Sequence, residues 1–201
     1  MNFLSISRWL FSLLLFPLFT SSLMAQNDLP LAEIPEAPDS YEAGNVIARM
    51  IEGLGFRYHW ATEGLTAEDL AYKPSEDART TAETLDHLLG LCETVYNAAR
   101  NEANLRPAVI GELSWEEKRA QTLQYLADAA ELMRGKSAQE VAELEVKFKR
   151  GERESAFPYW NMLNGPLADA LYHTGQIVAF RRASGNPIPS GVNVFMGTKR
   201  E

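Results

Sequence analysis

The stretch LADALYHTGQIVAFRRASGNPIP, residues 167–189, has the composition of a long helix that ends on a glycine. Pro166 precedes it and suits the first helical position, where a missing N–H costs no hydrogen bond. Gly185 provides the left-handed residue that ends many helices. Arg181 and Arg182 complement the negative end of the helix dipole. The stretch therefore predicts the last helix of a helical protein.

A first helix is predicted over residues 41–63. Its apolar residues recur at helical spacing, at Val46, Ile47, Met50, Ile51, Leu54 and Tyr58. Either Asp39 or Ser40 is placed to cap its start.

Two further helices are predicted from paired capping residues. Thr80 and Glu83 open one helix that continues through Ala99, and Ser114 and Glu117 open another that ends near Arg134. This spacing allows each side chain to bond a free backbone N–H at the helix start.

The segments between the helices complete the predicted fold. Residues 64–78 read as a connection with a helical turn of its own, and residues 144–159 alternate apolar and charged residues around Gly151, which predicts a short hairpin or an extended loop. The fold class is therefore predicted as all-α, a four-helix bundle. The long connections leave the packing order of the helices open.

The N-terminal end has the pattern of an export signal. Residues 1–25 contain one basic residue, Arg8, then an apolar run from Trp9 to Phe19, and small residues near Ala25. The run is short for a membrane span, which needs about 20 residues. We expect cleavage after Ala25 and a periplasmic location without a stable membrane span, with a retained N-terminal anchor as the alternative.

The expected domain order follows from this cleavage. Residues 26–39 are acidic and rich in proline and are predicted to be a tether. Residues 40–190 form the helical domain, and residues 191–201 form a C-terminal tail.

Charge and cysteine content narrow the classes of partner. The chain has 19 basic and 27 acidic residues, a formal charge of −8, which becomes −9 when residues 1–25 and Arg8 are removed. This acidity argues against a nucleic-acid partner, since phosphate contacts dominate such affinity. Cys92 is the only cysteine, so the chain forms no internal disulfide.

The three histidines supply the candidate chemistry. Asp169, His173 and Gln176 share one face of the last helix, because residues at i, i+4 and i+7 lie together. His87 lies at the boundary between the apolar and polar faces of its own helix. Asp169 and His173 with His87 would supply one carboxylate and two imidazoles to a divalent metal such as Zn²⁺, Ni²⁺, Fe²⁺ or Mn²⁺.

Simpler interpretations of these residues, without a metal, remain open. Asp169 and His173 are also spaced for a simple ion pair. His59 lies among aromatic residues that suggest packing, and Cys92 lies toward the apolar face of its helix. Glu83 is a candidate base or outer contact for the site, although the capping box already accounts for it.

The motifs taken together resemble the DinB-like (YfiT-like) superfamily of metal-binding four-helix bundles. The resemblance covers residues 41–189 and rests on RYHWATEGLTAEDLAYKP, ARTTAETLDHLLGLCE and the closing stretch with its histidine followed by Gly-Gln. It implies metal ligands at His87 and at an i, i+4 pair on the last helix. Asp169 departs from this pattern, because the family has histidine there.

The resemblance also implies a function. Active members are thiol S-transferases or metal-dependent hydrolases and isomerases, and an exported location favours a hydrolase, since low-molecular-weight thiols are mostly cytoplasmic. We expect a metal-dependent enzyme with an unknown small-molecule substrate, in which Gln176 orients water or a ligand. The alternative is a non-catalytic binding or interaction bundle in the cell envelope with a degenerate metal site. A homodimer is compatible with either.

Overall fold

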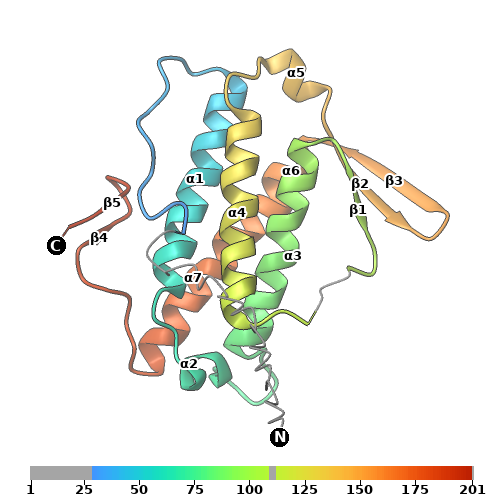
Figure 1. Ribbon diagram of the computed structural model, residues 1–201. Helices are drawn as coiled ribbons and strands as arrows, with labels where there is room; N and C mark the ends of the chain where they lie inside the picture. Colours follow the sequence, from blue (N-terminus) through green and yellow to red (C-terminus); the bar gives the residue numbers. More distant parts are fainter. Residues whose placement is uncertain (1–28, 109–111, 201) are drawn as a thin grey trace, which may run out of the picture.

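Four long helices form the main body of the protein. A computed structural model describes residues 29–108 and 112–200. The helices are α1 (Ala43–Thr62), α3 (Thr81–Ala99), α4 (Trp115–Met133) and α7 (Ala168–Ala183). Each packs against two others, in the cyclic order α1, α4, α3, α7 (Figure 1). Helices α3 and α4 run in the same direction, and α1 and α7 run opposite to them. The packing order that the sequence left open is thus decided.

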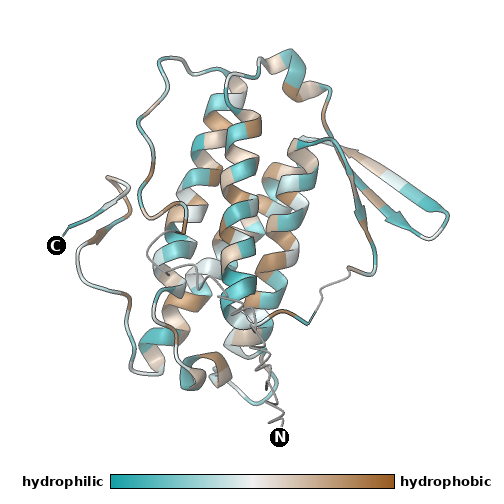
Figure 2. Cartoon of the chain, in the orientation of Figure 1, coloured by the Kyte–Doolittle hydropathy of each residue, from teal (hydrophilic) through white to brown (hydrophobic). Residues whose placement is uncertain are grey.

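The core lies on the axis between these helices. All four contribute side chains without solvent exposure, among them Ile51, Leu54, Leu88, Val95, Leu123, Leu126 and Ile177. Figure 2 shows hydrophobic and hydrophilic residues alternating along the ribbons of α1, α3 and α4, as helical periodicity requires. Burial of these apolar side chains is the main force that holds the helices together.

Capping boxes open two of the long helices as predicted. The Thr80 side chain accepts from the backbone N–H of Glu83 while the Glu83 carboxylate accepts from the Thr80 N–H, and Ser114 and Glu117 do the same. Two short helices, α2 (Ala67–Ala71) and α5 (Ala138–Ala142), begin with the same motif.

The predicted cap of α1 is wrong. Glu42 holds the N-cap position without a side-chain bond, and Ser40 Oγ instead accepts from Asn45 Nδ2 at 3.0 Å. The Gly44 N–H is satisfied from another element, because it donates to the Lys136 carbonyl at 2.9 Å. A tertiary contact has replaced the local cap.

The last helix begins at the predicted place. Gly165 breaks the helical backbone with φ −98° and ψ −105°, and Pro166 directly follows this break. A short helical stretch, α6 (Trp160–Met162) and the first residues of the π-helical turn η2 (Leu163–Leu167), precedes the break, and α7 continues after it. At the other end Gly185 has φ +92°, directly after the C-cap Ser184, as predicted.

The all-α prediction is wrong in one respect, because the fold is mainly helical but also contains small sheets. The predicted hairpin is present as β2 (Glu145–Arg150) and β3 (Arg153–Pro158). Strand β1 (Ala103–Leu105) pairs with β2 in parallel, which makes a three-stranded sheet. A second sheet joins β4 (Val192–Asn193) to β5 (Thr198–Lys199). Strands of two or three residues are too short to show a period, so their pairing was missed.

The segments outside residues 43–183 pack along α1. In the segment expected to be a tether, the Pro30 carbonyl lies 3.0 Å from His59 Nδ1, and the Ala32 carbonyl accepts from Trp60 Nε1 at 3.0 Å. Ile34 N–H donates to the Gly197 carbonyl at 2.8 Å and so ties this segment to the C-terminal sheet. The predicted signal, residues 1–25, lies outside the described residues. Within the described ranges no helix has the length and apolar character for a membrane span.

Candidate metal centre

Helix α3 places His87 at the edge of the core. The capping box at Thr80 fixes where the helix begins, and Leu85 and Leu88 on either side of His87 are buried. The His87 side chain is 36% exposed, so it lies between core and solvent as its helical position predicts.

Helix α7 carries the other two candidate ligands. The backbone break at Gly165 precedes it, and Asp169 falls in its first turn. Ala170, Thr174 and Ile177 are buried against the other helices, and this orientation turns the neighbouring face, with Asp169 and His173, toward α3. The Asp169 side chain is 43% exposed and that of His173 is 14% exposed.

The three predicted ligands meet at one point. His87 Nε2 lies 3.2 Å from Asp169 Oδ2, and His173 Nε2 lies 3.4 Å from Asp169 Oδ1. The two imidazole rings stand nearly perpendicular, at 85°, with centroids 4.7 Å apart. One ligand atom from each residue lies within 4.8 Å of the other two. The group is therefore close enough to hold a metal ion.

The spacing of these atoms approaches that of a tetrahedral site. Two nitrogen or oxygen ligands bound at 2.0–2.1 Å in a tetrahedral site lie about 3.4 Å apart. The two nitrogen–oxygen distances are near this value, but they run to different oxygens of Asp169, Oδ2 from His87 and Oδ1 from His173. Three protein ligands leave a fourth position for water or substrate, and the partial exposure of His87 and Asp169 leaves that side open.

Gln176 lies directly behind His173. The Gln176 amide nitrogen donates to Tyr172 Oη at 3.1 Å, so its carbonyl oxygen accepts from His173 Nδ1–H at 2.7 Å. In a neutral imidazole this bond uses the single N–H, and Nε2 would present a lone pair toward Asp169; in the doubly protonated ring, Nε2 would donate to Asp169. Gln176 thus holds the ring of His173; the role expected for it, orienting water or a ligand, stays a prediction.

A nitrogen lone pair that faces a carboxylate oxygen is repelled by it unless a positive charge lies between the two atoms. His173 Nε2 and Asp169 Oδ1 would repel each other at 3.4 Å unless a second proton or a metal cation lay between them. Among the described residues, the ion pairs of Asp169 are to His87 and His173, and none is to Lys or Arg. A second proton on the imidazole or a bound metal ion would each supply this positive charge.

The remaining candidates lie elsewhere. His59 is buried, its Nδ1 faces the Pro30 carbonyl, and burial lowers its pKa. Cys92 is fully buried in the core, which raises the pKa of its thiol. Glu83 serves the capping box, and the hydrogen bonds from Thr80 lower the pKa of its carboxyl.

Tyr172 was missed by the sequence reasoning. It precedes His173 and lies four residues before Gln176, a spacing that places it beside the amide on the same helix. Its ring also contacts that of His173, with centroids 5.2 Å apart.

The chain matches no protein-family model, no curated protein and no solved structure. The assignment of function therefore rests on the residues themselves.

Proposed function

We propose that His87, Asp169 and His173 bind a divalent metal ion, and that the protein is an exported metal-dependent hydrolase or transferase of the DinB-like kind. The observation that carries the proposal is the meeting of two imidazole nitrogens at one carboxylate, with the Nδ1–H of His173 already bonded to Gln176. The four long helices and the hairpin before the last helix support the DinB-like bundle.

The donor set restricts which ion fits. Two imidazoles and one carboxylate suit Zn²⁺, Ni²⁺, Fe²⁺ or Mn²⁺, and the choice among them depends on geometry and supply. Such an ion polarises substrate oxygens and activates water near neutral pH. The protein side chains supply orientation: Gln176 holds the ring of His173, while Asp169 reaches both histidines from α7.

A non-catalytic binding protein of the cell envelope is the second candidate. Asp169 favours it, because the resemblance implies histidine at this position and a carboxylate lowers the net charge of the site by one unit. An added negative charge weakens the electrophilic character of the bound ion while leaving it bound.

Metal content tests the proposal directly. The protein is isolated without a metal-binding tag, and bound metals are measured by elemental analysis. We expect near-stoichiometric divalent metal in the unaltered chain and its loss in His87→Ala and His173→Ala. The variant His59→Asn is the matched control, because it removes the third histidine and keeps a donor near Pro30; it should retain the metal.

Metal retained in both alanine variants would refute the site.

To separate the two candidate functions, the metal-loaded protein is assayed on ester and amide substrates. Turnover that disappears with His173→Ala supports an enzyme, whereas bound metal without turnover supports the binding protein.

A further inference from the structure

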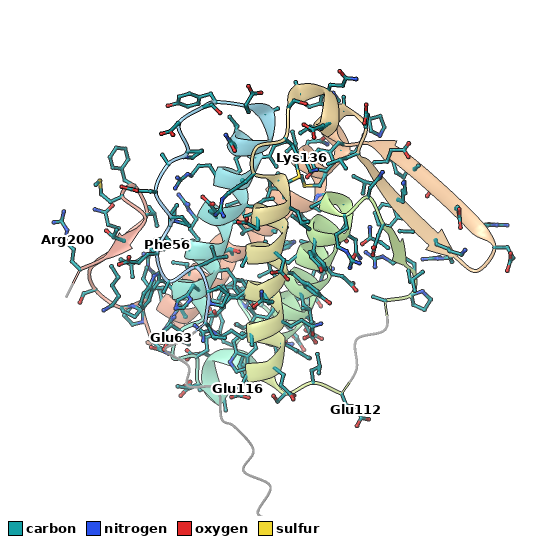
Figure 3. The ribbon with its side chains drawn as sticks, turned by 45° about the horizontal axis from the view of Figure 1, so that its top comes forward. Phe56, Glu63, Glu112, Glu116, Lys136 and Arg200 are labelled. Atoms are coloured by element: carbon teal, nitrogen blue, oxygen red, sulfur yellow. The ribbon has the colours of Figure 1, made fainter. Side chains whose placement is uncertain are left out.

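A recess of about 380 Å³ opens at the end of the molecule where α1 begins. Its walls come from α1, from α5 and from the segment that leads from β3 into η2. Figure 3 brings this end forward, with Lys136 labelled in the loop that joins α4 to α5. The larger side chains of the wall are those of Val46, Ile47, Val141, Tyr159, Trp160 and Leu163. None of the described residues that line it is charged.

Hydrogen bonds between α1 and the loop after α4 hold two walls of the recess in place. The Gly44 N–H donates to the Lys136 carbonyl at 2.9 Å, and the Gly135 N–H donates to Asn45 Oδ1 at 2.8 Å. A Cβ atom at Gly44 would lie 2.1 Å from the Met133 carbonyl oxygen, so α1 meets the end of α4 at the closest approach that glycine allows. These contacts fix where α5 starts relative to α1, and so hold two of the walls together.

The walls expose apolar surface that the protein itself leaves uncovered. Helix α5 has no buried residue, although Ala138, Val141 and Ala142 face the recess. The residue exposure is 76% for Trp160 and 43% for Val46. Covering apolar surface is worth about 25 cal/mol per Å², so an apolar occupant is favoured here.

Volume and charge indicate the class of occupant. The recess exceeds twice the roughly 150 Å³ of an engineered cavity that binds benzene, and it falls within the range of about 300–1,000 Å³ for small-molecule sites. An ion would lose its hydration without gaining a charged partner. Two aromatic side chains line the recess: Trp160, which is 76% exposed, and Tyr159, which is buried at its base.

We propose that this recess binds a small, neutral, aromatic molecule. The site is separate from the metal centre, since none of His87, Asp169 and His173 lines it. It goes beyond the proposed function and does not depend on it.

Fluorescence titration with N-phenyl-1-naphthylamine, a neutral aromatic probe, tests this proposal. The protein is isolated without detergent. We expect saturable binding at one site per chain. Ala142→Trp fills the recess from an exposed position and should weaken binding about tenfold or more. Ala179→Trp, at an exposed position of α7 outside the recess, adds the same indole and should bind as the unaltered protein does.

Three results would overturn the proposal: no saturable binding, equal binding by Ala142→Trp, or a dimer in sedimentation that Ala142→Trp dissociates. The last would mean that a second copy covers the recess. Thermal unfolding of each variant establishes that it is folded. His87→Ala removes a proposed metal ligand outside the recess and should keep the probe affinity. The failure of the metal site can therefore be told apart from the failure of the recess as a binding site.

Discussion

His173 is held by a chain of two side chains, those of Gln176 and Tyr172. Tyr172 Oη accepts from the Gln176 amide, and the Gln176 carbonyl oxygen accepts from His173 Nδ1. Such outer contacts fix the tautomer of a histidine ligand and raise its basicity. Gln176 is thus a positioning residue, and Tyr172 fixes which way its amide points.

Removing this contact should weaken metal binding. In Gln176→Leu, His173 keeps its place on α7 but loses its oriented N–H, and we expect a metal dissociation constant about 10–100-fold larger. Tyr172→Phe should have a smaller effect in the same direction. Competition with a chelator of known affinity measures both.

Helix α4 offers a matched control for this prediction. Gln121 Nε2 donates to Tyr125 Oη at 2.7 Å, a glutamine–tyrosine pair of equal spacing away from the site. Gln121→Leu should leave the metal affinity unchanged. An unchanged dissociation constant in Gln176→Leu would show that the amide has no positioning role.

At the scale of elements, two buried arginines hold the C-terminal end of α1. Arg181 Nη1 donates to the carbonyls of Trp60, Ala61 and Glu63 at 2.9–3.2 Å. Arg119 Nη2 donates to the His59 carbonyl at 3.3 Å and forms an ion pair with the Glu63 carboxylate at 2.6 Å. The last carbonyls of a helix have no hydrogen-bond donor within the helix. Here the guanidinium groups of Arg119 on α4 and Arg181 on α7 donate to them.

Arg181→Leu should destabilise the fold strongly. It leaves buried carbonyls without donors, which costs about 3 kcal/mol of the free energy of unfolding. Arg182→Leu is the control, because Arg182 is exposed on the same helix; it should change the free energy by about 0.5 kcal/mol or less. Urea denaturation measures both, and equal stability of the two variants would contradict this account.

At the scale of the whole molecule, Asp69 joins two distant parts of the chain, residues 66–69 and residues 184–186. Its carboxylate accepts from Thr66, the N-cap of α2, from Ser184 at the end of α7 at 2.5 Å and from Asn186 Nδ2 at 2.6 Å. Burial raises the pKa of this carboxyl, but the hydrogen bonds from Ser184, Asn186 and Thr66 outweigh burial and lower it to about 2. The connection after α1 is thereby fastened to the end of α7.

This pKa predicts how stability depends on pH. The folded-state pKa lies below the unfolded value of about 3.9, so the contribution is present above that pH and is lost as pH falls toward 2. Asp69→Asn should be less stable by about 2 kcal/mol at pH 7, and the difference should shrink between pH 4 and pH 2. Urea denaturation at several pH values tests this.

Glu68→Gln is the control for this prediction. Glu68 is the exposed neighbour of Asp69 on α2, and its variant should follow the unaltered protein at every pH. A stability difference for Asp69→Asn that stays constant from pH 7 to pH 2 would contradict the assigned role of the carboxylate.

Local signals explain most of what was predicted correctly. The capping boxes at Thr80 and Ser114 and the glycine end at Gly185 depend on a few neighbouring residues, and the structure has each of them. The three candidate ligands could also be predicted from the sequence, and the structure groups them. Helical spacing alone places Asp169 and His173 on one face, and His87 was selected because it lies at the edge of an apolar face.

The errors occur where a distant contact replaced a local one. Gly44 receives its hydrogen-bond partner from the loop after α4, so no local cap forms at α1. Strand β1 exists because β2, more than forty residues later, pairs with it. Arg181 suits the helix dipole by its position, yet it is buried and bonds the carbonyls of α1.

The sequence by itself determined the four long helices, where three of them end or begin, and which side chains can donate to a metal, because periodicity, capping and donor chemistry act over one or two helical turns. Only the tertiary structure decided the order of the helices and the approach of His87 to the pair on α7. It also decided the hydrogen bond that orients His173 and the apolar recess beneath α5. These depend on which surfaces meet across the core, and that is set by the packing of residues far apart in the chain.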